Sequence, residues 1–201
     1  MNLFKNLFSI LFVISFATIA GCSSPKTKYF ILDDAPASTI TKYRSCNRII
    51  AIDKVTVANY LDKPNIITRI KPNELLKAEF YRWSEPLDNN IQRVLQQNLS
   101  RQLKSDTLLT YPWLGKPAID YRIEIAVNQF DVDNSGNSVL KVSWNIYDDK
   151  KVLIKSKKAT YNANASDPAN YLDIVRTMNK NITLLGNDLA GQLSGFCYKN
   201  K

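Results

Sequence analysis

The chain has 201 residues, of which 45% are hydrophobic and 22% are charged. Its 27 lysines and arginines against 18 aspartates and glutamates give a formal net charge of +9, and it contains no histidine. The commonest general base and metal ligand is therefore missing, which argues against the histidine-dependent classes of enzyme.

The first 21 residues have the pattern of a secretory signal peptide. Lys5 precedes an apolar run, residues 7–20, which is shorter than the roughly 20 residues that a membrane span needs. The end of this run, Ile19-Ala20-Gly21-Cys22, resembles a bacterial lipobox, in which the cysteine thiol receives a diacylglycerol. We expect cleavage before Cys22 and acylation of this cysteine, palmitate included. The alternative is an ordinary signal peptide or an uncleaved anchor.

The lipobox resemblance also gives Ser23 a role. In the bacterial sorting rule, a residue other than aspartate after the lipidated cysteine directs a lipoprotein to the outer membrane. Several acyl chains make such an anchor durable, because each buried methylene contributes about 0.8 kcal/mol. We expect the mature protein on the periplasmic face of the outer membrane, with residues 22–28 as a lipidated tether and residues 29–201 as one domain. Nucleic acid is not an expected partner.

The two remaining cysteines, Cys46 and Cys197, would lie in a compartment where disulfides persist. We expect them to pair and to tie the start of the domain to its C-terminus. In the chain-entropy model, closing such a long loop stabilises the fold by at most roughly 4–5 kcal/mol. The alternative is two free thiols.

Short strands and loops are predicted for the first part of the domain. The hydrophobic alternation and the turn residues predict strands at residues 29–32, 48–57, 65–70 and 74–81. A loop rich in Pro, Ala, Ser and Thr, residues 33–45, follows the first strand, and a link, residues 58–64, joins the second strand to the third.

Two amphipathic helices are predicted around an antiparallel meander. The first helix follows a capping candidate, Ser84, and a first-turn proline, Pro86, and its apolar residues recur from Leu87 to Leu103. Three alternating strands follow at residues 119–128, 140–146 and 152–161. The second helix opens at Asp167-Pro168 and carries an apolar stripe from Tyr171 to Leu193. The predicted fold class is α/β: a two-layer sandwich with a mainly antiparallel mixed sheet and two long helices in a single domain.

Motifs for catalysis or cofactor binding are missing from the sequence. It contains no glycine-rich phosphate loop, and neither acylated nor paired cysteines offer a free thiol. We interpret Asp120 and Glu124 as solvated residues on the polar face of a strand, and the basic run 155–158 as a solvated surface. We expect no enzyme activity, no cofactor and no metal. A serine-lysine hydrolase is an alternative without a supporting motif.

Four short blocks, in this order, resemble the PqiC/YmbA family of ABC-type transport auxiliary lipoproteins. They are residues 29–32, 55–61, 83–87 and 94–99, and the meander and the C-terminal helix follow in the same order. The resemblance implies a non-enzymatic part of a lipid transport system, in which an inner-membrane complex and an MCE-domain tunnel carry lipids across the periplasm. It implies a homo-oligomeric ring that is held in outer-membrane lipid by acylated Cys22, docks the tip of the tunnel and supports membrane integrity. The alternative is a structural lipoprotein that binds peptidoglycan or a porin.

Candidate partner contacts lie in the link and before the first helix. The link carries Tyr60, Leu61, Asp62 and Pro64, where an aromatic residue and a leucine offer apolar anchors. The alternative is a proline-terminated turn that folds back onto the core. Trp83 is either a contact or a packing residue that fixes the angle at which the chain enters the helix. The polar face of the second helix is left for subunit contacts and carries Asn179, Thr183 and Asn187.

Overall fold

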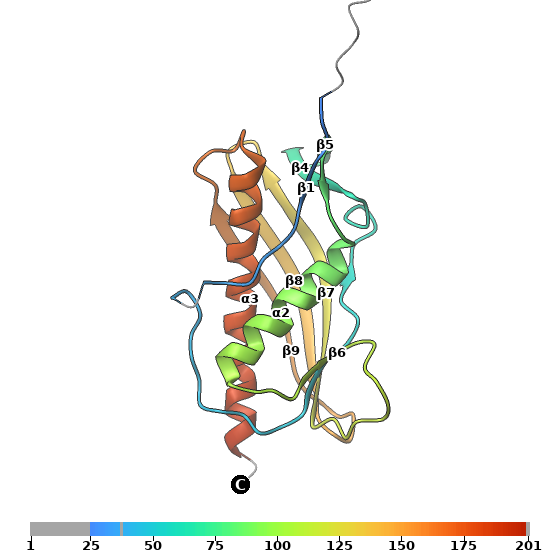
Figure 1. Cartoon of the computed structure of the whole chain (residues 1–201), viewed down its shortest axis with the longest axis vertical. Coiled ribbons are helices and arrows are strands. Elements are labelled where there is room, and N and C mark those ends of the chain that lie inside the picture. Colours follow the sequence, from blue (N-terminus) through green and yellow to red (C-terminus); the bar gives the residue numbers. More distant parts are fainter. Residues whose placement is uncertain (1–24, 37, 200–201) are drawn as a thin grey trace, which may run out of the picture.

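The computed structural model describes residues 25–36 and 38–199 (Figure 1). They form two layers, in which helices α2 and α3 cover one face of a mixed nine-stranded sheet. The predicted fold class is thereby confirmed. The signal peptide, Cys22 and Ser23 lie outside the described residues.

An antiparallel meander forms one half of the sheet. It consists of β7 (Tyr121–Asp133), β8 (Asn137–Tyr147) and β9 (Leu153–Asn164). Alternate residues of β7 and β8 are buried beneath the helices, as the period-two pattern predicts. A bulge between Val127 and Gln129 shifts this alternation, so that Phe130 and Val132 are buried in the last part of β7.

Short strands complete the sheet on the other side of β7. Three pair with β7 in parallel: β2 (Ile50–Ile52) near its start, β3 (Thr56–Val57) in its middle and β4 (Asn65–Lys71) at its end. Three lie further out: β6 (Leu108–Thr110) beside β2, β5 (Glu74–Trp83) beside β4, and β1 (Lys28–Phe30) beside β5. The single strand predicted at 48–57 is therefore two strands, and β6 was not predicted at all. A strand of only three residues that pairs with strands far away in the sequence is too short to show a hydrophobic alternation.

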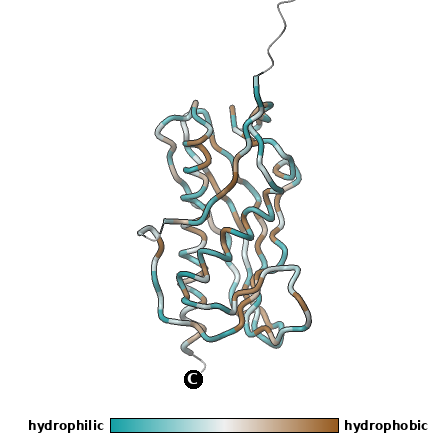
Figure 2. The backbone as a smooth tube through the Cα atoms, in the orientation of Figure 1, coloured by the Kyte–Doolittle hydropathy of each residue, from teal (hydrophilic) through white to brown (hydrophobic). Residues whose placement is uncertain are grey.

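Both predicted helices are present: α2 (Leu87–Leu103) and α3 (Tyr171–Lys199). Their sides toward the sheet are apolar, and Figure 2 shows hydrophobic and hydrophilic residues alternating along the chain. The predicted cap at Ser84 is wrong, because Pro86 takes the N-cap position of α2 without a side-chain hydrogen bond. At the start of α3 the cap lies later than predicted, since the Asn170 side chain accepts the Leu172 N–H at 3.0 Å.

Residues 32–36 and 38–46, here called the strap, run across the outer side of α3 (Figure 1) and are hydrogen-bonded to both helices. Side-chain oxygens of four asparagines accept backbone N–H groups of the strap: Asn90 from Leu32, Asn98 from Ala35, Asn179 from Asp33 and Asn187 from Thr41. The two asparagines of each helix lie about two turns apart and so share one face. The strap therefore satisfies part of its backbone through side chains of the helices instead of a strand ladder.

The strap corrects the prediction that one face of α3 is free. Asn179 and Asn187 hold strap residues, and Thr183 lies with them in a groove of about 680 Å³ between the strap and α3. At the end of the strap, the Cys46 N–H donates to the Leu103 carbonyl at 2.9 Å, and a disulfide joins Cys46 to Cys197 with a Cα–Cα distance of 5.7 Å. The strap is thereby attached to the last turns of both helices.

Candidate partner-binding surfaces

The link between β3 and β4 is a compact turn held by its own backbone. The Leu61 N–H donates to the Ala58 carbonyl at 2.8 Å, and the Trp83 N–H donates to the Pro64 carbonyl at 2.6 Å. The side chains of Leu61 and Trp83 are only 1% and 4% exposed and belong to the hydrophobic core.

Leu61 therefore packs onto the core, which is the second of the two interpretations of the link. Trp83, before α2, is likewise a packing residue. Neither side chain is available to a partner on the surface of the folded chain. Asp62, Lys63 and Pro64 are exposed and remain as candidate contacts.

Tyr60 takes part in a buried polar cluster that sequence reasoning missed. The Asp131 carboxylate accepts hydrogen bonds from Arg69 Nη2 at 2.6 Å, Arg69 Nε at 3.1 Å, the Tyr60 hydroxyl at 3.1 Å and Gln129 Nε2 at 2.8 Å. Burial, reinforced by the Asp131 charge, raises the pKa of Tyr60 to about 12. An aspartate between Phe130 and Val132 was a usable signal, since a carboxylate inside an apolar stretch needs partners.

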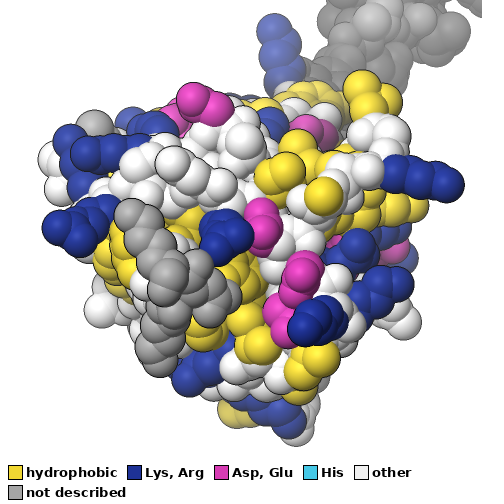
Figure 3. Space-filling model, turned by 90° about the horizontal axis from the view of Figure 1, so that it is seen from below, with side chains coloured by type: hydrophobic (Ala, Val, Ile, Leu, Met, Phe, Trp, Pro, Cys, Tyr) yellow, Lys and Arg dark blue, Asp and Glu magenta, His cyan; other side chains and the backbone are white. Residues whose placement is uncertain are grey.

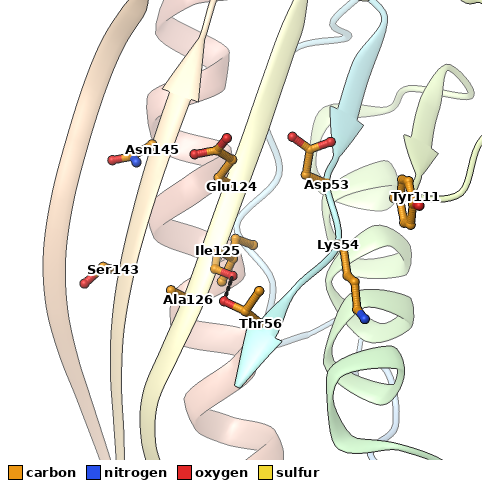
Figure 4. Close-up of a pocket in the computed structure, with 9 residues that line it drawn as sticks. All are labelled: Asp53, Lys54, Thr56, Tyr111, Glu124, Ile125, Ala126, Ser143 and Asn145. Atoms are coloured by element: carbon orange, nitrogen blue, oxygen red, sulfur yellow. Dashed lines mark hydrogen bonds between the residues drawn. The ribbon is translucent and has the colours of Figure 1, made fainter. Parts of the chain in front are cut away.

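A shallow hollow of about 390 Å³ lies where the first half of β7 meets β3 and β8 on the face away from the helices (Figure 4). Its acidic groups are occupied: Asp53 pairs with Arg122 at 3.2 Å, and Glu124 accepts the Tyr147 hydroxyl at 2.8 Å. Burial raises the pKa of Asp53, and the Arg122 charge opposes this shift. The remaining lining combines polar residues such as Lys54 and Ser143 with apolar ones such as Tyr111 and Ile125.

The carboxylates singled out in the sequence are not simply solvated. Asp120 accepts the Ile49 N–H at 2.7 Å and pairs with Arg48 at 3.3 Å, and Glu124 is held by Tyr147. In the basic run, Lys157 pairs with Asp188 of α3 at 2.6 Å. These charges hold strands and helices together. Among the residues that the structure describes, no group of three metal-ligating side chains is found.

The large exposed hydrophobic side chains lie mainly toward the two ends of the molecule. The upper end in Figure 1, where the tether leaves, has Leu75 and Leu76 in β5 and Leu172 at the start of α3. The lower end, residues 111–118, 148–153 and the last turn of α3, has Tyr111, Leu114, Val152, Leu153 and Tyr198. Figure 3 shows this lower end, where hydrophobic side chains are interspersed with basic and acidic ones. We take these two groups of exposed apolar side chains as the candidate binding surfaces.

These features define a class of protein: a single α/β domain that follows a lipobox-like sequence and carries candidate binding surfaces. Within the described residues, none of the helices has the length and hydrophobicity needed to cross a membrane. Residues 29–190 match the family described as ABC-type transport auxiliary lipoprotein component, and the chain belongs to this family. The resemblance seen in the sequence blocks is thereby confirmed.

Named relatives agree with this assignment, and solved structures share the fold. The chain is 26% identical to the intermembrane transport lipoprotein PqiC of Escherichia coli K12 over 136 residues, which cover 67% of this chain and 71% of the relative; the protein of the same name from Shigella flexneri gives the same values. A crystal structure of a protein from Xanthomonas campestris shares the fold with a TM-score of 0.73 at 14% identity, covering 87% of this chain and 100% of that one. A second solved structure, of an uncharacterized protein, has a TM-score of 0.70 at 17% identity over 84% of this chain and 99% of that one.

Proposed function

We propose that this chain is the outer-membrane-anchored auxiliary lipoprotein of an MCE-type intermembrane lipid transport system. The observation that carries the proposal is the family match, which spans residues 29–190 directly behind a lipobox-like sequence. The Escherichia coli relative is itself named for intermembrane transport. The role is one of docking: a ring of copies receives the tip of the periplasmic tunnel, and no catalytic step is required of this chain.

The distribution of exposed side chains supports a particular orientation. An acylated Cys22 would hold the upper end toward the membrane, because the tether leaves there (Figure 1). The lower end then faces the periplasm, where the tunnel arrives. Its exposed hydrophobic residues, among them Tyr111 and Leu114, supply apolar anchors for the tunnel. The exposed residues of the link, Asp62 and Pro64, are candidates for contacts between neighbouring copies.

Anchoring is tested by two substitutions in the full chain. Cys22→Ala should remove palmitate incorporation and release the protein from the outer membrane, whereas Ser23→Asp should keep the acylated protein at the inner membrane. Metabolic labelling and membrane fractionation read out both results. Palmitate incorporation in Cys22→Ala equal to that of the wild type would disprove the anchor, and outer-membrane location of Ser23→Asp would disprove the sorting rule here.

Partner choice is tested by purification from detergent-solubilised envelope. A transport auxiliary should bring down an MCE-domain protein, whereas recovery of peptidoglycan or a porin instead would favour the structural alternative. Leu114→Asp should abolish recovery of the MCE protein and leave the fold intact, because Leu114 is 97% exposed. Leu184→Asp, at an exposed leucine on the side of α3, is the matched control and should retain the partner. Equal recovery with both variants would place the docking surface elsewhere.

A further inference from the structure

The β4–β5 hairpin extends beyond the core at the upper end of the molecule. Residues 71–77 are all exposed, and burial in β5 begins at Ala78. Two of the exposed side chains are large and apolar: Leu75 is 39% and Leu76 is 51% exposed. Consecutive residues of a strand point to opposite faces, so the hairpin tip, residues 70–77, presents one leucine on each face. The Leu76 face looks onto a hollow of about 330 Å³ that Leu76 lines together with Pro168 and Tyr171. A chain alone in water gains no stability from this arrangement.

The hairpin tip is held firmly by the rest of the fold. At its base, Arg69 is fixed by the buried Asp131 and donates through Nη1 to the Pro72 carbonyl at 2.7 Å. Further along β5, the Tyr81 ring stacks on Tyr171 of α3, with 3.8 Å between ring centroids and an interplanar angle of 4°. The leucines are therefore presented in a defined position.

The described chain before β1 and the hairpin run in the same direction, and the longest reach of the tether is similar to the length of the hairpin. β1 pairs in parallel with β5, with Lys28 opposite Tyr81, so the chain before Lys28 sets out along the direction that leads from Tyr81 back to Glu74. From Cys22 to Lys28 a fully extended chain spans at most about 20–22 Å. The part of β5 from Tyr81 back to Glu74 spans about 23 Å. Figure 1 shows the tether and the hairpin at the same end of the molecule.

We propose that the hairpin tip lies against the same bilayer that holds the acyl chains of Cys22, with Leu75 and Leu76 at the level of the lipid headgroups. The inference rests on the proposed lipid anchor and adds a second, protein-mediated contact with the membrane. A tether this short keeps the start of β1 within about 22 Å of the bilayer, and with the domain upright the tip then reaches the membrane surface. The bilayer thereby fixes the orientation of the domain as well as its location.

Charge favours a bilayer over a second copy of the chain as the occupant. Lys71 and Lys77 lie beside the leucines in the hairpin tip, and its one acidic residue, Glu74, pairs with Lys71 at 3.4 Å. Lysines beside apolar side chains suit an interface of anionic phosphates over hydrocarbon, which their long stems can follow.

The test uses the acylated full chain in vesicles of phosphatidylethanolamine and phosphatidylglycerol, without a transport partner. A cysteine is introduced by Leu76→Cys and labelled with an environment-sensitive fluorophore, and nitroxide groups are placed on the lipids at headgroup depth. Leu114→Cys is the matched control, because it replaces an exposed leucine at the opposite end of the molecule. The parent chain is labelled in parallel to measure the background from its own cysteines.

We expect the lipid nitroxides to quench the label at position 76 at least about twofold more than the label at position 114. Equal quenching at the two positions in an acylated chain would overturn this inference and leave the anchor standing. A label at position 76 that is shielded from aqueous iodide but not quenched by lipid would also overturn it, in favour of contact with a second copy. Mass spectrometry of the same preparation decides the anchor separately, and a chain without acyl groups would remove both proposals.

Discussion

Removal of Arg69 tests the buried cluster that joins the hairpin to the long central strand. The Asp131 side chain is 2% exposed, and Arg69 is its counter-ion at 2.6 Å. Arg69→Ala leaves that carboxylate buried with only the neutral donors Tyr60 and Gln129. Breaking a buried pair in this way should lower the free energy of unfolding by about 3–5 kcal/mol.

The same strand supplies the matched control for this prediction. Lys71 pairs with Glu74 at 3.4 Å, but these side chains are 74% and 55% exposed. Lys71→Ala should therefore cost at most about 1 kcal/mol. The double variant Arg69→Met with Asp131→Leu removes both charges and should recover most of the loss, because apolar pairs of similar volume often replace buried ion pairs without penalty.

The measurement is urea unfolding of the chain from residue 22 onward, followed by fluorescence of its three tryptophans. Arg69→Ala should shift the midpoint strongly, and Lys71→Ala should shift it slightly. If both single variants lost the same small amount of stability, the Arg69–Asp131 pair would be no more important than a surface ion pair. The reasoning from burial would then be refuted.

Three further predictions follow from the core, the disulfide and the tyrosines. Leu61→Glu should lower the free energy of unfolding by at least about 3 kcal/mol, because its carboxylate would lie in the core, and a stably folded Leu61→Glu would contradict this prediction. Asp62→Arg should keep the circular dichroism spectrum of the wild type and weaken copy–copy association in sedimentation. The double variant Cys46→Ser with Cys197→Ser should lower the free energy of unfolding by up to roughly 4–5 kcal/mol and leave partner recovery intact at permissive temperature. If mass spectrometry found two free thiols in the periplasmic wild-type protein, the bridge would not form in the cell. The free energy of unfolding should fall as the pH rises from about 10 to about 12, since the folded chain keeps the Tyr60 proton to about pH 12 and the unfolded chain loses it near pH 10. Tyr60→Phe should make this fall less steep, and an unchanged slope would argue against a contribution from Tyr60.

The elements that could be predicted are those with a long local pattern. The meander and both helices follow from apolar residues that recur every second or every third to fourth position, such as Leu140 and Val142 in β8. The three-residue strand β6 and the separation of β2 from β3 have no such pattern. They are defined by parallel pairing with strands far away in the chain, which no short window of sequence contains.

Polar contacts between residues far apart in the sequence could not be predicted either. Arg69 and Asp131 are 62 residues apart, and the asparagine of α3 that holds Asp33 is 146 residues away from it. Asp131 inside an apolar stretch indicates that a partner is needed, but nothing in the sequence says that the partner is Arg69. Only the folded chain brings donor and acceptor together, and so only the fold shows that one face of α3 is covered by the strap.

The sequence by itself determined the class of protein, because a lipobox-like motif and the order of the family blocks are read in one dimension, and the family assignment agrees. It also determined the helices, the meander and the two-layer fold. The tertiary structure decided which residues can meet a partner. In the link, Leu61 is buried while its neighbour Asp62 is exposed, because burial depends on the elements that pack above a residue and not on its position in a turn. The same long-range packing places the hairpin leucines at the end from which the tether leaves and Leu114 at the opposite end, so that one end can face the membrane and the other the periplasm.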